Sequence, residues 1–115
     1  MDITIVREPV SREELQRIAK DQFGDFVKAV VDVERGIMAI GGELHADEEV
    51  VLSEQGSERK HTWGINLYPE RSGEDWIEFH SMINIKPQYD NCSRDIADAA
   101  IKEKIRAIVQ KLVSS

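Results

Sequence analysis

The chain has 115 residues, close to the commonest size of a single domain, and this length excludes an enzyme with separate cofactor and substrate domains. Hydrophobic residues make up 41% and charged residues 32% of the chain, which is the composition of a globular protein. The formal net charge of −7 repels polyphosphates and so disfavours nucleic acid as a partner. We expect one domain over residues 1–115.

Cysteine content and hydropathy both bear on where the protein works. The single Cys92 excludes an internal disulfide framework and a multi-cysteine zinc site, and it suits a reducing compartment. Residues 1–7 lack the pattern of a signal peptide, and no apolar run approaches the ~18 residues that span a bilayer. The sequence therefore predicts a cytoplasmic protein without membrane contact.

A helix is predicted over residues 12–22, after a short β-prone run at 3–6. Ser11 and Glu14 have the spacing of a capping box, in which the hydroxyl and the carboxylate satisfy amides at the start of a helix. Gly24 tolerates the left-handed conformation that ends many helices. These signals fix both ends of the helix.

Residues 25–34 alternate as in a half-buried strand, whose core-facing residues would be Val27, Ala29, Val31 and Val33. A three-residue turn at Glu34, Arg35 and Gly36 then fits a hairpin, because glycine supplies the positive φ that such a loop needs. The returning antiparallel strand is expected over 37–45. Its core-facing residues would be Met38, Ile40 and Leu44.

The remainder predicts one short helix, two strands, a loop and a final helix. Acidic residues from Asp47 onward suit the first turn of a helix over 47–56. Strands are expected over 61–68 and 76–85, followed by a loop over 86–98. Asp98 would cap a final helix with one apolar stripe, formed by Ile101, Ile105, Ile108, Val109 and Leu112.

These elements predict an α+β fold with a four- to five-stranded antiparallel or mixed sheet. The N- and C-terminal helices would pack on one face, and the short helix would lie between the central strands. Too few helices are predicted to cover both faces of such a sheet. We therefore expect one face to stay partly open.

Three segments resemble a small prokaryotic family of uncharacterised proteins, known only as a domain of unknown function. The segments are residues 30–36, residues 40–49 and residues 63–70, and the similarity extends to residues 77–79 and 81–87. The resemblance implies a single-domain cytosolic protein. It implies no activity and assigns no catalytic residue.

A doubled Glu-x-His pattern is the arrangement that looks most chemical. Glu43 with His45, and Glu78 with His80, would each share one face of a predicted strand, because side chains alternate along a strand. These four residues are our candidate catalytic residues. They are also the candidate ligands of a divalent metal such as zinc, which would lower the pKa of bound water.

The sheet topology decides whether the two pairs meet. If the helix over 47–56 is a crossover, its flanking strands are parallel, and Asn66 and Tyr68 lie with Glu43, His45 and Glu78. If the sheet is a plain antiparallel meander, the pairs lie apart, and His45 lies near Asn84. Both topologies are kept open.

Other residues could complete a ligand site. Asn66, Tyr68 and Asn84 follow the predicted polar face, and Arg94 in the loop could anchor an anion. Turn and cap formation explains loop residues of this kind equally well. The acidic residues 47–49 could join a cation shell, although the electrostatics of a helix start already account for them.

The second hypothesis requires no chemistry. One predicted sheet face mixes apolar, aromatic and charged residues as a subunit interface does, and it carries Phe26, Val30, Ile37, Trp76 and Met82. We favour a binding or interaction module that forms a homo-oligomer through this polar and aromatic face. A small-molecule ligand at the same face is compatible with it, and a metal-assisted hydrolase that uses the two Glu-x-His pairs is the alternative.

Overall fold

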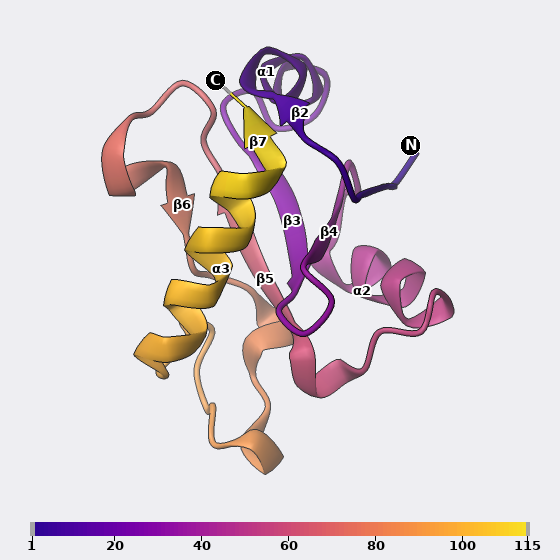
Figure 1. The fold of residues 1–115 in the computed structure, drawn as a ribbon, viewed down its shortest axis with the longest axis vertical. Coiled ribbons are helices and arrows are strands. Elements are labelled where there is room, and N and C mark those ends of the chain that lie inside the picture. The colour runs from indigo at the N-terminus through magenta and orange to yellow at the C-terminus, as the bar shows by residue number, and fades with distance from the viewer. Residues whose placement is uncertain (1, 115) are drawn as a thin grey trace.

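The computed structural model describes residues 2–114, which form an α+β fold. Within these residues lies a five-stranded antiparallel sheet with the strand order β1-β4-β3-β5-β6 (Figure 1). Its strands are β1 (Thr4–Val6), β3 (Val27–Asp32), β4 (Ile37–Ile40), β5 (Thr62–Leu67) and β6 (Ile77–Glu78). The predicted fold class is confirmed.

Three α-helices accompany the sheet within the described range: α1 (Arg12–Asp21), α2 (His45–Glu54) and α3 (Ala99–Leu112). Short 3-10 helices are η1 (Arg59–His61), η2 (Gly73–Trp76), η3 (Met82–Asn84) and η4 (Pro87–Tyr89). A separate parallel pair joins β2 (Val10–Ser11) to β7 (Val113–Ser114) and so ties the start of α1 to the end of α3. Figure 1 shows α3 crossing in front of β3 and β5.

The larger core lies between α1, α3 and one face of the sheet, here called the first face. Its sheet residues include Val27, Ala29, Val31, Met38 and Ile40. Leu15 of α1 packs against them, and so do three residues of α3, namely Ile105, Val109 and Leu112. The terminal helices therefore share one face, as the apolar patterns predict.

The opposite, second face has a smaller core beneath α2. Val30, Ile37 and Ala39 of the sheet pack with Leu52 of α2 and with Ile83 of η3. The proposed interface residues Val30 and Ile37 are therefore covered, which corrects that part of the prediction. Each Å² of apolar surface removed from water stabilises a fold by ~25 cal/mol. For Val30 and Ile37, other residues of the same chain already provide this burial.

The predicted helix ends are confirmed by their capping bonds. The Ser11 Oγ atom accepts a hydrogen bond from the amide of Glu14 at 3.0 Å, and the amide of Gly24 donates to the carbonyl of Ala19 at 2.6 Å. Gly24 has a φ of +96°, which glycine adopts without strain. At α3, the carboxylate of Asp98 accepts from the amide of Ala100.

The β3–β4 hairpin forms as predicted, with a loop one residue longer. Asp32 pairs with Ile37, so four residues, 33–36, lie between them instead of three. The carboxylate of Asp32 accepts hydrogen bonds from the amides of Glu34 and Arg35, which fixes the longer loop. Gly36 has the expected positive φ, at +68°.

The returning strand ends at Ile40, so the prediction of a strand over 37–45 is wrong in its second half. Gly41 has a φ of +94°, and a Cβ atom there would lie 2.6 Å from the carbonyl oxygen of Asp2. The chain therefore leaves the sheet at this glycine. Leu44 becomes the N-cap of α2 and is 55% exposed, so it does not belong to the core.

The strand expected over 76–85 is also mostly absent, because β6 has only two residues. Trp76, which was expected on the polar and aromatic face, joins the core of the first face, and Ile83 packs in the core of the second face. Asn84 explains the change: its Oδ1 atom accepts from the Gly64 amide at 2.7 Å, and its Nδ2 atom donates to the Gly64 carbonyl at 3.0 Å. This amide thus fastens η3 over β5.

The crossover topology is the one that forms. Both β4 and β5 pair antiparallel with β3, so they run in the same direction, and α2 lies on the connection between them. The carboxyl ends of β4 and β5 consequently lie at the same end of the sheet. No helix in the described residues is long and apolar enough to cross a membrane.

Asn84→Ala should destabilise the fold by about 2–4 kcal/mol, because it leaves both backbone groups of Gly64 without partners in a buried place. Urea unfolding followed by circular dichroism measures the change. The control is Gln88→Ala at an exposed position of η4. Equal stability of the two variants would show that the amide does not hold η3.

Candidate functional site

A row of polar side chains crosses the second face at the carboxyl end of β5. Lys28 of β3 pairs in register with Asn66 of β5, and Asn66 pairs with Glu78 of β6. Register partners point to the same face of a sheet, so the three side chains lie side by side. Together with His45, this row is called the polar cluster below.

His45 enters the polar cluster as the first residue of α2. Its ring is buried, and Nε2 lies 2.8 Å from the carbonyl oxygen of Ile65. The close approach is possible because Gly64 has no side chain: a Cβ atom there would lie 3.2 Å from Cδ2 of His45. The start of α2 is thereby held against β5.

The His45 imidazole is electrically neutral in this setting. Burial lowers its pKa below the ordinary 6.5, the bond to Ile65 partly opposes this, and the nearby Lys28 ammonium lowers the pKa further. Because a carbonyl oxygen only accepts, the proton of the neutral ring is on Nε2. The Nδ1 atom is then an acceptor and a potential base.

Asn66 is the most constrained member of the polar cluster. Its Nδ2 atom donates to Oε1 of Glu78 at 2.8 Å and approaches the carbonyl of His80 at 3.5 Å. Its side chain also interacts with the His45 ring and raises the pKa of His45. Within residues 2–114, its Oδ1 atom is buried and has no partner at hydrogen-bonding geometry. A buried acceptor of this kind is costly unless water or a ligand donates to it.

A buried carboxyl group also interacts electrostatically with Lys28. Glu48 of α2 has no exposed surface, and its Oε2 atom accepts from the amide of Gly42 at 3.0 Å. Burial raises its pKa to about 9, and this effect outweighs the Gly42 bond and the Lys28 charge that lower it. Glu48 is therefore protonated and uncharged at neutral pH.

Aromatic rings continue the site beyond the start of β3 and the end of β5. Phe23 and Phe26 stack with their centroids 4.8 Å apart, and Phe26 lies 5.4 Å from Tyr68. The ammonium of Lys28 lies 5.0 Å from the Phe23 centroid, and the guanidinium of Arg71 lies 3.8 Å from that of Tyr68. These rings form a partly exposed aromatic surface beside the polar cluster.

A hollow of about 390 Å³ adjoins Lys28. Its lining comprises Asp21, Gln22, Phe23, Lys28, Glu43 and Leu44. Hollows of this size hold small ligands or side chains of a partner. Here the predicted residue Glu43 is found, exposed and in the loop before α2 instead of in a strand.

The structure brings together several of the predicted site residues. His45, Asn66 and Glu78 belong to the polar cluster, and the Tyr68 hydroxyl lies 3.4 Å from Oε1 of Glu78. The exposed His80 follows β6, and its charge lowers the pKa of His45. The strand geometry assumed for both Glu-x-His pairs is wrong, because neither pair lies within one strand.

Two predicted ligand-binding residues have other contacts. Asn84 has no exposed surface and bonds to the backbone of Gly64 and to the carbonyl of Arg94. The same Arg94 carbonyl also accepts from the amide of Ser81. Asn84 thereby connects the segment around Arg94 to Gly64 of β5, two residues before Asn66.

Lys28 was not selected from the sequence, and Glu48 was considered only as one of three acids that could join a cation shell. Alternation places Lys28 on the polar face of its strand, which was the available signal. Glu48 looks like one more acid of a helix start, and nothing in the sequence shows that it is buried. In the described residues, no group of three or more His, Cys, Asp or Glu is arranged to hold a metal ion.

The fold and the polar cluster define an α+β domain with a mixed polar and aromatic surface. The chain matches the family model described as "Protein of unknown function (DUF5674)" over residues 4–112. It therefore belongs to the DUF5674 family. Comparison with curated proteins and with solved structures gave no match.

Glu48 should make stability depend on pH. Its folded pKa of about 9 lies above the ordinary 4.5, so the folded state keeps a proton that the unfolded state releases, and stability falls as pH rises between these values. Glu48→Gln removes this loss. Its unfolding free energy should equal that of the wild type near pH 4.5 and exceed it at pH 8 by at least about 1.4 kcal/mol, the equivalent of one pKa unit.

Urea unfolding at a series of pH values measures this difference. The control is Glu54→Gln, which removes a carboxylate from an exposed position at the end of the same helix. A pH-independent difference for Glu48→Gln, or one that the control shares, would show that Glu48 is ionised in the folded protein.

Proposed function

We propose that this protein is a binding module that associates with a second copy of itself through the uncovered end of the second face. This surface, called the open face, comprises the polar cluster and the aromatic rings of Phe23, Phe26 and Tyr68. The observation that carries the proposal is the group of partly exposed rings beside the accessible charged side chains of Lys28 and Glu78. Aromatic and apolar anchors around a few polar groups are typical of interfaces.

Two exposed apolar side chains border the open face. Leu44 is 55% exposed and Met82 is 63% exposed. Leu44 directly precedes His45, and Met82 directly follows Ser81. The side chains of His45 and Ser81 both lie close to Gly64. Leu44 lines the same hollow as Phe23, and exposed leucine and methionine side chains of this kind are typical of surfaces that a partner covers.

A second copy is the favoured occupant because the open face carries both hydrogen-bond donors and acceptors, and both positive and negative charges. An isologous interface places a patch against itself, so the patch must offer donors and acceptors and charges of both signs. The Lys28 ammonium and the Tyr68 hydroxyl can donate to a partner, while the exposed Glu78 carboxylate can accept. A small polar ligand would use the same groups.

The alternative of a hydrolase has one supporting observation. The backbone bond of His45 leaves Nδ1 as a base, and Asn66 links this region to Glu78. This arrangement favours metal-free general-base chemistry over the metal-assisted form, which would need donors beyond the grouped residues. Metal analysis of protein purified without an affinity tag addresses the metal-assisted form directly.

Tyr68→Glu should dissociate the proposed homodimer, because it removes a ring from the open face and places a carboxylate beside Glu78. Analytical ultracentrifugation should give a dissociation constant at least about tenfold higher than that of the wild type. The control is Tyr89→Glu, since Tyr89 is exposed on η4 outside the open face. Thermal unfolding verifies that both variants are folded.

A wild type that stays monomeric at ~100 μM would refute self-association, and so would equal dissociation of the two variants. Stoichiometric zinc, manganese or iron that is lost in the double variant His45→Ala and His80→Ala would instead favour the hydrolase.

A further inference from the structure

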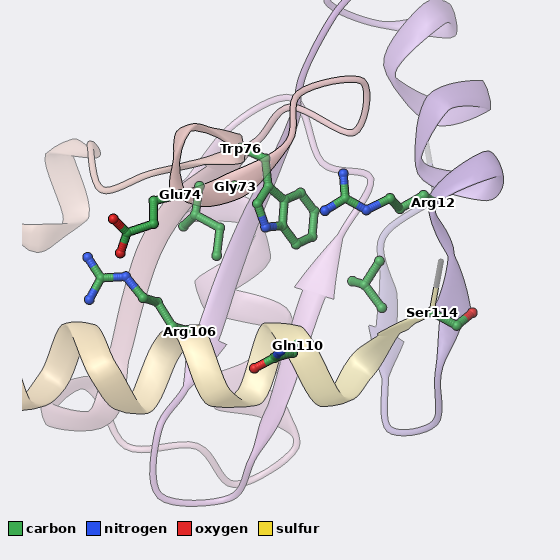
Figure 2. A pocket seen from close by; sticks show the side chains of 9 residues that line it. Arg12, Gly73, Glu74, Trp76, Arg106, Gln110 and Ser114 are labelled. Carbon is green, nitrogen blue, oxygen red and sulfur yellow. The ribbon is translucent and has the colours of Figure 1, made fainter.

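A second hollow lies on the α3 side of the sheet, away from the open face. It measures about 620 Å³ and lies between α3, the η2–β6 segment and the start of α1 (Figure 2). Its lining comprises Arg12, Gly73, Glu74, Trp76, Ile77, Arg106, Gln110, Val113 and Ser114. The volume falls in the range of about 300–1,000 Å³ that is typical of small-molecule sites.

The charge of this hollow contrasts with that of the whole chain. Two arginines and one carboxylate line it, whereas the protein has a formal net charge of −7. Figure 2 shows Arg106 and Glu74 turned towards each other at one end, and Arg12 beside Trp76 at the other. Because the hollow has more guanidinium groups than carboxylates, an anion binds more favourably here than on the rest of this acidic protein.

Arg12 is held in place before any ligand arrives. Its guanidinium lies 3.9 Å from the centroid of the Trp76 ring, and its Nη1 atom donates to the carbonyls of Pro69 and Arg71 at 3.1 and 2.8 Å. Both of these bonds use one nitrogen, and a guanidinium has five N–H donors. The remaining donors are therefore presented in a fixed orientation, which lowers the entropic cost of binding.

The opposite wall comes from one side of α3. Arg106 and Gln110 are four residues apart, so they lie on the same side of the helix, and Ser114 follows in β7. The Arg106 side chain is about one third exposed, at 35%, and pairs with Glu103 on its own helix. Apolar surface between the polar ends comes from Trp76, Ile77 and Val113.

We propose that this hollow binds a small organic carboxylate. The carboxylate would be held by guanidinium and side-chain amide or hydroxyl donors, and its apolar body would lie along Trp76, Ile77 and Val113. Arg106 would exchange its exposed pairing with Glu103 for the ligand. Such exposed ion pairs contribute little to stability, so the exchange costs little. This site is independent of the open face.

Titration with phenylacetate, followed by the indole N–H signals in nitrogen-15 NMR spectra, tests the proposal. The Trp76 signal should shift and saturate, whereas the signal of Trp63, a buried residue that does not line the hollow, should stay in place. Trp76→Phe assigns the two signals. Arg106→Gln should weaken binding about tenfold, as expected when one charge-assisted hydrogen bond is lost.

Two controls separate a site from general charge effects. Arg17→Gln removes an exposed arginine that also pairs with a glutamate on its own helix but lies outside the hollow, and it should leave the affinity within about twofold. Phenylacetamide, the neutral analogue, should bind at least about tenfold more weakly than phenylacetate. Absence of saturation, equal binding of the amide, or equal effects of the two arginine variants would overturn the proposal.

Discussion

The contact of α2 and η3 with β5 at Gly64 is the constraint on which the candidate site depends. Because this residue has no side chain, His45 and Ser81 both reach the sheet, and Asn84 satisfies both backbone groups of Gly64 from beside the strand, where a pairing strand would otherwise lie. The start of α2 is thereby fixed next to Asn66, and the second face is covered only in part. A larger residue at this position would push both segments away from the sheet.

Much of the fold could be predicted because local signals agree with the tertiary structure. The cap at Ser11, the alternation along β3 and β5 and the apolar stripe of α3 each reflect burial against one core. The two strands that were predicted too long failed for tertiary reasons. Gly41 leaves the sheet beside the backbone of Asp2, and Asn84 replaces strand pairing by side-chain bonds to Gly64.

The sequence predicted most residues of the candidate site, but not the geometry in which they are arranged. The crossover hypothesis placed Glu43, His45, Asn66, Tyr68 and Glu78 together. His45, Asn66, Tyr68 and Glu78 do lie close to one another, although His45 is on a helix, whereas Glu43 lies in the exposed loop before α2. The prediction that both residues of each Glu-x-His pair point to the same face of a strand was wrong. The chain leaves the sheet before Glu43 in the first pair, and directly after Glu78 in the second. Burial of Glu48 depends on how α2 packs over Gly42, which periodicity does not show.

The most direct test of this account is the pKa of His45, measured by NMR titration of its ring in the full chain. Burial against β5 and the charge of Lys28 predict a value below 6.5 that rises in Lys28→Gln, and that stays unchanged in Lys20→Gln, which removes an exposed lysine of α1. A value at or above 6.5 that responds to neither variant would contradict it, since His45 would then be neither buried on β5 nor part of one polar cluster with Lys28.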